Sequence, residues 1–139
     1  MSTKLVLVVA IALQDAKGRY LLAQRPEGKS MAGLWEFPGG KIETGETPEN
    51  ALVREVFEEL GVEIDEKHLE PVTFTSFAYP SFHLLMPLYR CRTWIGEVQS
   101  KEGQSFAWVK PNSLHDYPAP EADHFLFDVL SGNSVLEIP

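Results

Sequence analysis

Residues 47–61 read "TPENALVREVFEELG" and carry the clearest helix signal in the sequence. Thr47 is a favoured capping residue, and Pro48 is favoured at the first helical position because it has no N–H to leave unpaired. Gly61 is suited to the left-handed backbone that ends many helices. The apolar residues between them recur at helical spacing and should face the core. They are Leu52, Val53, Val56, Phe57 and Leu60.

Three glutamates lie on the opposite side of this predicted helix. Glu55 and Glu59 are four residues apart, and like charges at that spacing cost a few tenths of a kcal/mol. Arg54 can pair with Glu58 at the same spacing, which leaves the other two acids without a helical partner. A solvated polar face is one interpretation. Clustered carboxylates also bind hard divalent cations through oxygen, so the spacing favours a metal-binding face.

The preceding segment, "PGGKIETGE" over residues 38–46, supports the metal interpretation. Gly39 and Gly40 have no side chains, so their backbone can approach an ion closely. Gly45 allows a tight turn that brings Glu46 back toward the start of the helix. Mg²⁺ prefers oxygen ligands and keeps waters or substrate phosphates in its open positions. The segment and helix together therefore predict a site for Mg²⁺ or Mn²⁺.

The spacing of these residues resembles the signature of the Nudix hydrolases, G-x5-E-x7-R-E-U-x-E-E-x-G-U, where U is aliphatic. The matching residues are Gly40, Glu46, Arg54, Glu55, Val56, Glu58, Glu59, Gly61 and Val62. The segments "LLAQRPEGKSMAGLWEFPGGKIE" (21–43) and "YPAPEADHFL" (117–126) are similar to the MutT-like branch of that family. This branch converts nucleoside triphosphates to monophosphate and pyrophosphate, and it includes enzymes for 8-oxo-dGTP and for CTP.

The resemblance implies a role for each acid near the helix. The implied catalytic residues are Glu55, Glu58, Glu59 and Glu102, which also bind the metal with a carbonyl of Gly39 or Gly40. Arg54 and Glu46 would hold these acids in place. Either Glu55 or Glu102 would accept a proton from the water that attacks the β-phosphorus. From composition alone, Glu102 could also be an exposed loop residue.

The resemblance also implies substrate contacts from Arg25, Glu36, Phe37 and Asp123. From the residues alone, Arg25 could equally be an exposed arginine at the end of a strand. Aromatic residues in such motifs are more often core, which is the interpretation preferred for Trp35, Phe37, Phe77, Tyr79 and Phe82.

Asp123 departs from the pattern of members selective for 8-oxoguanine, which carry asparagine at the corresponding position. An ionised aspartate can only accept hydrogen bonds, whereas asparagine also donates them. The change favours cytidine nucleotides as an alternative substrate, although oxidised purine triphosphates remain the slightly preferred prediction. Asp123 could also cap the last helix. ADP-ribose, dinucleoside polyphosphates and a nucleotide-binding protein without catalysis are the further alternatives.

The rest of the sequence predicts one α+β domain over residues 1–139, a mixed sheet sandwiched between helices. Strands are expected at 4–13, with 19–24 as its hairpin partner, around 35–37, and from 71, 83 and 106, with a second helix over 121–130. Pro87 should mark an edge strand or a bulge.

Composition limits the possible partners. The formal net charge of −8 argues against nucleic-acid polymers. The apolar run at residues 4–13 is too short to cross a membrane as a helix. A single cysteine, Cys91, fits a buried strand residue and a reducing compartment. We therefore expect a cytoplasmic monomer that binds a small nucleotide.

Overall fold

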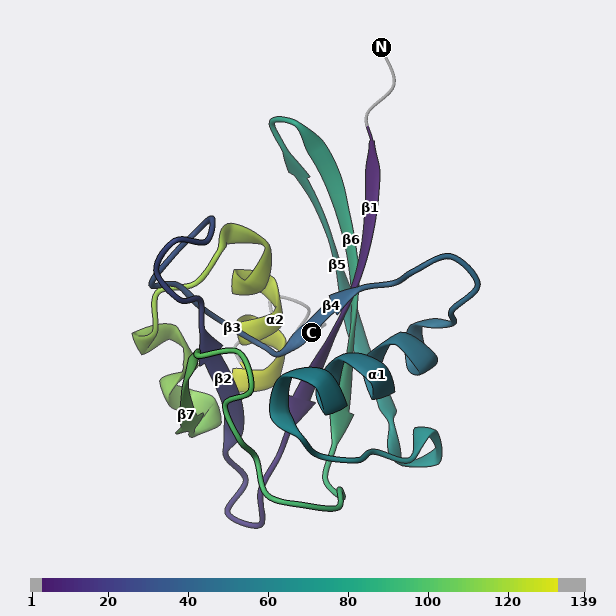
Figure 1. Cartoon of the computed structure of the whole chain (residues 1–139). Helices are drawn as coiled ribbons and strands as arrows, with labels where there is room; N and C mark the ends of the chain where they lie inside the picture. Colours follow the sequence, from purple (N-terminus) through teal and green to yellow (C-terminus); the bar gives the residue numbers. More distant parts are fainter. Residues whose placement is uncertain (1–3, 133–139) are drawn as a thin grey trace, which may run out of the picture.

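A four-stranded mixed sheet forms the centre of the molecule in the computed structural model, which describes residues 4–132 (Figure 1). Its strands, in spatial order, are β4 (Gly39–Lys41), β1 (Leu5–Leu13), β6 (Phe82–Cys91) and β5 (Glu70–Tyr79). β1 runs parallel to β6, and the other two pairs are antiparallel. Parallel and antiparallel pairs in one sheet, together with helices, confirm the predicted α+β class.

A second, three-stranded antiparallel sheet consists of β3 (Trp35–Glu36), β2 (Tyr20–Gln24) and β7 (Ser105–Val109). The predicted hairpin between residues 4–13 and 19–24 is wrong, because β1 and β2 share only one bridge, from Gln14 to Tyr20. β6 occupies one edge of β1 and β4 occupies the other at residues 8–10; past the bridge that follows β1, β2 turns away and pairs with β7.

Helix α1 (Pro48–Leu60) begins and ends where the sequence predicts. The side-chain oxygen of Thr47 accepts a hydrogen bond from the Asn50 N–H at 3.1 Å, and Gly61 ends the helix with φ of 72°. One apolar residue differs from the prediction. Phe57 is 56% exposed, because it lies at the margin of the face that α1 turns toward the sheet.

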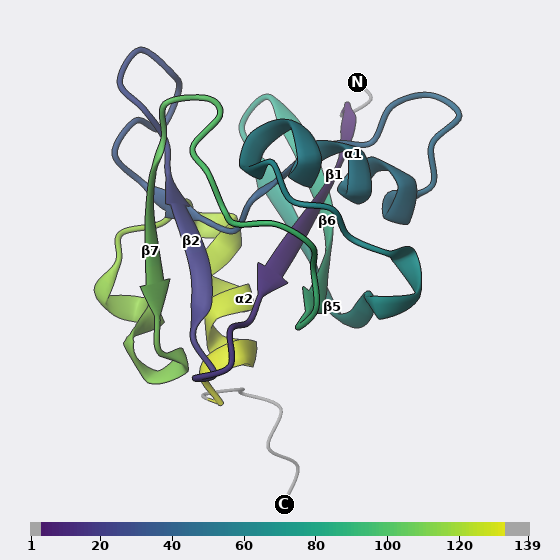
Figure 2. The ribbon, with the colours of Figure 1, turned by 60° about the horizontal axis from the view of Figure 1, so that its bottom comes forward.

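Helix α2 (Glu121–Ser131) confirms the second predicted helix and lies on the other side of β1 from α1 (Figures 1 and 2). Side chains of β1 alternate between the two layers: Val9 and Ile11 pack with α1, whereas Ala10 and Ala12 pack with α2. Two short 3-10 helices, η1 (Glu66–His68) and η2 (Pro111–Asp116), complete the described elements. The sheet is therefore sandwiched between helices, as predicted.

Pro87 lies in β6, which has a neighbour on each side, so the predicted edge position is wrong. The ladder between β1 and β6 is interrupted there: Leu7 pairs with Leu85, and pairing resumes only with Ala10 and Leu88. Proline has no N–H to donate, which explains the gap. A register shift in β5, between Pro71 and Thr73, lies opposite the next residues of β6.

Two smaller predictions also have an outcome. Cys91 is fully buried in β6 and its thiol donates to the carbonyl oxygen of Thr93 at 3.1 Å, as expected for a structural cysteine. None of the helices within residues 4–132 has the length and apolar character needed to cross a membrane.

Candidate active site

The double glycine of β4 brings the backbone directly against two glutamates of α1. The Gly39 N–H donates to Glu59 Oε2 at 3.2 Å. A Cβ added to Gly40 would lie 2.3 Å from the carboxyl carbon of Glu55, far closer than real contacts allow. A Cβ on Gly39 would lie 2.0 Å from the carbonyl oxygen of Val9. Only glycine at both positions lets β4 pair with β1 and touch the acids of α1 together.

Arg54 organises the acids at the start of this site. Its Nε and Nη2 donate to the two oxygens of Glu46 at 2.7 and 2.9 Å, a two-pronged arrangement that suits a planar guanidinium. Its Nη1 donates to Glu55 Oε1 at 2.8 Å. Hydrogen bonds from Arg54 lower the pKa of Glu46 to about 2. Glu46 is therefore a permanent anion that positions Arg54, and Arg54 positions Glu55.

Glu58 is the most open of the three helix acids. Its side chain is 51% exposed, and it lies 3.4 Å from Arg54 Nη1, a longer contact than those to Glu46 and Glu55. The pairing of Arg54 with Glu58 that the helix spacing predicts therefore exists, but it is the weakest of the three. Glu58 remains available to a ligand from solvent.

Glu59 is held in an unfavourable place for a lone anion. Burial, followed by the charges of Glu55 and Glu102, raises its pKa to about 8, although the Gly39 N–H acts in the opposite direction. Burial also raises the pKa of Glu55, opposed by Arg54. A divalent cation among these groups would favour their ionised forms. The donor set, carboxylate oxygens beside a glycine backbone, is the kind that Mg²⁺ prefers.

The acids do not surround a common point in this structure. Within residues 4–132, no group of three or more His, Cys, Asp and Glu side chains is arranged to hold a metal ion. The hydrogen bonds above give the reason, since Glu55 is directed at Arg54 and Glu59 at the Gly39 N–H. The residues fit a divalent cation in chemistry and proximity, whereas their side chains are turned to internal partners.

Glu102 reaches this region because its loop is fastened to the end of α1. The N–H of Lys101 donates to the carbonyl oxygen of Glu59 at 3.1 Å, and that of Gln99 to Leu60 at 2.9 Å. Gln104, only 8% exposed, accepts from the Glu102 N–H at 3.1 Å through its side-chain oxygen. Sequence reasoning missed Gln104, and a buried amide in a turn leaves no pattern that would reveal it.

A cavity of about 300 Å³, here called the acidic cavity, lies between this loop and β2. Its lining residues are Ala23, Gln24, Arg25, Pro26, Lys29, Glu36, Glu59, Glu102 and Gln104. Arg25 is not free in it, because Nη1 donates to Glu36 Oε2 at 2.9 Å and Nε donates to the carbonyl oxygen of Ser30 at 2.7 Å. Burial raises the pKa of Glu36, and Arg25 lowers it.

A second cavity, of about 370 Å³ and here called the aromatic cavity, lies on the α2 side of the same ion pair. Tyr79, Phe82 and Met31 border it together with Asp123, Gly39 and Gly40. Arg25 and Glu36 border both cavities. The ion pair is therefore the boundary that a ligand occupying both cavities would have to cross. Tyr79 and Phe82 were expected in the core, with contact to a base as the less favoured alternative; in the structure both are half-buried and line this cavity.

Asp123 lies almost completely buried in the first turn of α2, with 4% exposure. Burial, followed by the charge of Glu36, raises its pKa to about 8, although the Phe37 backbone and Arg25 act in the opposite direction. The cap of α2 is Pro120, with no side-chain hydrogen bond, so the interpretation of Asp123 as a helix cap is wrong. The Ala122 N–H beside it donates instead to the Tyr79 hydroxyl at 3.3 Å.

Phe37 has a double role in the packing. It is 4% exposed, and its ring packs edge-on against Phe127 at 5.5 Å between centroids, as core aromatics do. It also borders the aromatic cavity. Trp35 lies farther from this cavity and packs edge-on against Tyr117 at 5.2 Å.

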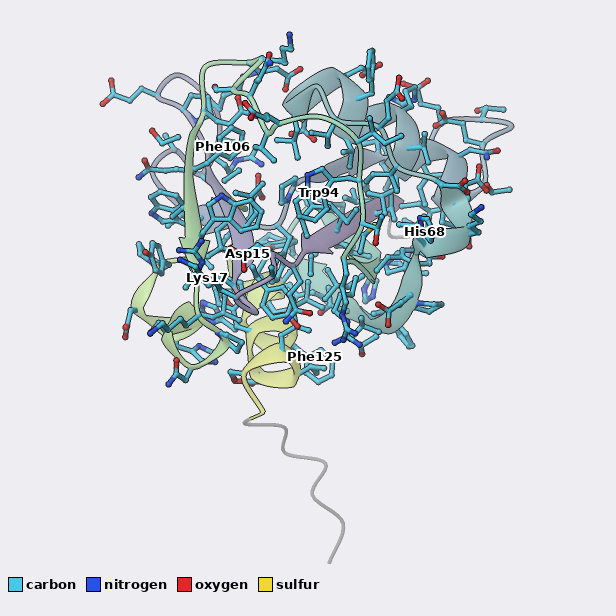
Figure 3. All side chains as sticks on the ribbon, turned by 90° about the horizontal axis from the view of Figure 1, so that it is seen from below. Asp15, Lys17, His68, Trp94, Phe106 and Phe125 are labelled. Carbon is cyan, nitrogen blue, oxygen red and sulfur yellow. The ribbon has the colours of Figure 1, made fainter. Side chains whose placement is uncertain are left out.

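A larger surface hollow, of about 640 Å³, lies beyond α1 and contains none of the predicted site residues. Figure 3 labels His68 and Trp94, two of its lining residues. Its acids are Glu63, Asp65 and Glu66, of which Asp65 is held by the Lys67 N–H. Size alone therefore does not mark the site, because the predicted catalytic and substrate-binding residues that line a cavity line the two smaller ones.

Comparison with known proteins agrees with this geometry. The family model for the NUDIX domain matches residues 8–128, most of the chain. The chain belongs to the Nudix family. The matched range includes both glycines of β4, all of α1, Glu102 and Asp123, and thus all of the acidic cavity and all of the aromatic cavity except Val6.

Two curated Nudix relatives match the chain over most of their lengths. An "8-oxo-dGTP diphosphatase" of Haemophilus influenzae is 38% identical over 123 residues, which cover 88% of this chain and 89% of the relative. A "CTP pyrophosphohydrolase" of Escherichia coli is 37% identical over 130 residues, covering 86% and 87%. The solution structure of the E. coli ORF135 protein has a TM-score of 0.81 at 32% identity, covering 99% of this chain and 96% of that one.

Proposed function

We propose that this Nudix protein is a Mg²⁺-dependent nucleoside triphosphate pyrophosphohydrolase that releases a nucleoside monophosphate and pyrophosphate. The observation that carries the proposal is the junction of the two cavities. Glu59 and Glu102 border one, Asp123 and three aromatic residues border the other, and the Arg25–Glu36 pair separates them. Relatives that are 38% and 37% identical carry names of nucleotide pyrophosphohydrolases, which supports this reading.

The residues that would hold Mg²⁺ or Mn²⁺ are Glu55, Glu58, Glu59 and Glu102, with a carbonyl of Gly39 or Gly40. A bound divalent cation neutralises phosphoryl oxygens and lowers the pKa of a bound water. The close approach of Gly40 to Glu55 and the raised pKa of Glu59 support this assignment.

The protein's own groups supply positioning and proton transfer. Displacement at phosphorus depends mainly on placing the water and the phosphates in line. Glu55 and Glu102 are the two candidates to accept the proton of the attacking water. Arg54 holds Glu55 at 2.8 Å and thereby fixes its direction, whereas Glu102 depends on Gln104 and the end of α1 for its place.

The burial of Asp123 changes what this residue can do for a base. With a pKa near 8, it is mostly protonated at pH 7. A protonated carboxyl group both donates and accepts a hydrogen bond, as the asparagine amide does. The argument that an aspartate can only accept therefore does not apply here, and 8-oxo-dGTP becomes the first candidate substrate.

Cytidine nucleotides are the second candidate. One similarity and one residue favour them: the 37% identity to a protein named CTP pyrophosphohydrolase, and Asp123, whose carboxyl group can accept from the exocyclic amine of cytosine in its protonated form too.

A nucleotide panel tests the proposal. We would compare kcat/KM for 8-oxo-dGTP, dGTP, CTP, 5-methyl-dCTP, ADP-ribose and diadenosine polyphosphates, with Mg²⁺ and with EDTA. Pyrophosphate release from a triphosphate that EDTA abolishes is the expected result. If the protein binds nucleotides but hydrolyses none of the panel, the proposed enzyme activity is wrong and the protein is a nucleotide-binding protein.

A further inference from the structure

Lys29 lies on the segment 25–34 that connects β2 to β3, and its side chain is exposed. The segment is tied to Arg25. The Arg25 N–H donates to the carbonyl oxygen of Leu34 at 2.9 Å, and the guanidinium donates to the Ser30 carbonyl oxygen at 2.7 Å and to its hydroxyl at 3.3 Å. Because Ser30 is the next residue, these bonds also place Lys29.

Lys29 borders the acidic cavity together with Glu36, Glu59 and Glu102. It nevertheless makes no salt bridge to any of the residues that the structure describes. Arg25, which borders the same cavity, is engaged by Glu36 at 2.9 Å. Lys29 and the acids thus line one cavity without forming an ion pair, which suits a ligand that carries a cation toward the acids and anionic oxygens toward the lysine.

The cavities suggest which part of a nucleotide Lys29 would meet. Arg25 and Glu36 border both cavities, whereas Lys29 borders only the acidic one. With a base in the aromatic cavity, the sugar and first phosphate would lie near the Arg25–Glu36 boundary, and the last phosphate would lie farther into the acidic cavity. A lysine is a flexible point charge with three donors, which suits the freely rotating end of a phosphate chain.

We propose that Lys29 binds the terminal phosphate of a nucleoside triphosphate and so makes the enzyme select triphosphates over diphosphates. The proposal rests on the function proposed above and adds a specificity residue to it. Lys29 takes no part in the bond-breaking step, so its removal should weaken binding of the longer phosphate chain and leave the turnover of bound substrate intact.

The test compares Lys29→Ala and Lys29→Arg with the wild type on 8-oxo-dGTP and CTP and on their diphosphates, 8-oxo-dGDP and CDP. Lys17→Ala is the matched control, because Lys17 is an exposed lysine in the turn at the other end of β2 (labelled in Figure 3). For Lys29→Ala we expect KM for the triphosphates to rise about tenfold, the worth of one hydrogen bond to a charged group. We expect kcat within about twofold, unchanged constants for the diphosphates, and recovery in Lys29→Arg.

The outcomes separate the two proposals. If the wild type hydrolyses triphosphates and Lys29→Ala keeps the wild-type ratio of triphosphate to diphosphate kcat/KM, Lys29 has no such role and the proposed function stands. If Lys29→Ala lowers kcat/KM equally for triphosphates and diphosphates, Lys29 does not select the length of the phosphate chain. A wild type that hydrolyses none of these nucleotides overturns the proposed function and the role of Lys29 together.

Discussion

Glu59 and Asp123 are carboxyl groups on the walls of neighbouring cavities, and burial, followed by nearby acidic charges, raises the pKa of each to about 8. Their surroundings differ. Glu59 lies among other acids and one backbone N–H, whereas Asp123 lies beside aromatic side chains and the N-terminal turn of α2. Under the proposed function the same shift therefore has two meanings: in the acidic cavity it suits a bound cation, and in the aromatic cavity it would supply a hydrogen-bond donor.

The largest expected effect tests the acidic cavity. Glu59→Gln keeps the size of the side chain and removes its charge, so we expect pyrophosphate release to fall by about 10³-fold or more, as when a group that stabilises the transition state is lost. Glu63→Gln, in the hollow beyond α1, is the matched control and should keep wild-type activity. Steady-state rates with Mg²⁺ measure both, and similar losses in the two variants would show that the acidic cavity has no special role.

The next effect tests the contact between β4 and α1. Gly40→Ala places a Cβ where the Glu55 carboxylate lies, 2.3 Å from its carboxyl carbon. Displacing a reacting group by about 1 Å can cost on the order of 100-fold, so we expect a loss of that size in kcat/KM. Gly45→Ala is the comparison, because its Cβ meets no atom within 4 Å and only its φ of 85° is strained. Equal activity in the two variants would contradict the close approach.

A smaller effect tests the aromatic cavity. Asp123→Asn should shift the ratio of purine to pyrimidine kcat/KM by about tenfold, the worth of one good polar contact. The absolute rate on the better substrate should change less than in Glu59→Gln. An unchanged ranking of bases across the panel would remove Asp123 from base recognition.

The last prediction concerns folding stability instead of activity. The folded pKa of Asp123 lies above its unfolded value, so the folded state binds more protons, and stability falls as pH rises from about 4 to about 8. Asp123→Asn removes that dependence. Relative to wild type it should therefore gain stability with rising pH, by about 3 to 4 kcal/mol between pH 5 and pH 8. Urea unfolding at several pH values measures this; parallel curves would mean that Asp123 titrates normally. Glu59 is present in both proteins, so its contribution to the pH dependence of stability cancels in the comparison.

The sequence by itself determined the local parts of this protein. The cap at Thr47, the end at Gly61 and the side of α1 that carries the acids all follow from residues within one or two helical turns, where spacing alone fixes geometry. The signature around Gly40 and Glu55 likewise pointed to the family, and the family match bears this out. The residues of one helix and its preceding loop were enough to predict both the bounds of the helix and the family.

Only the tertiary structure decided the features that depend on distant segments. The pairing of β2 with β7 instead of β1 joins two strands that lie far apart in the chain. The raised pKa of Asp123 depends on its burial and on the charge of Glu36, a residue far away in the chain. The position of Glu102 depends on two backbone hydrogen bonds to the end of α1. Strand partners, burial and loop docking are set by competition among all elements for the same space, and no local pattern records the outcome.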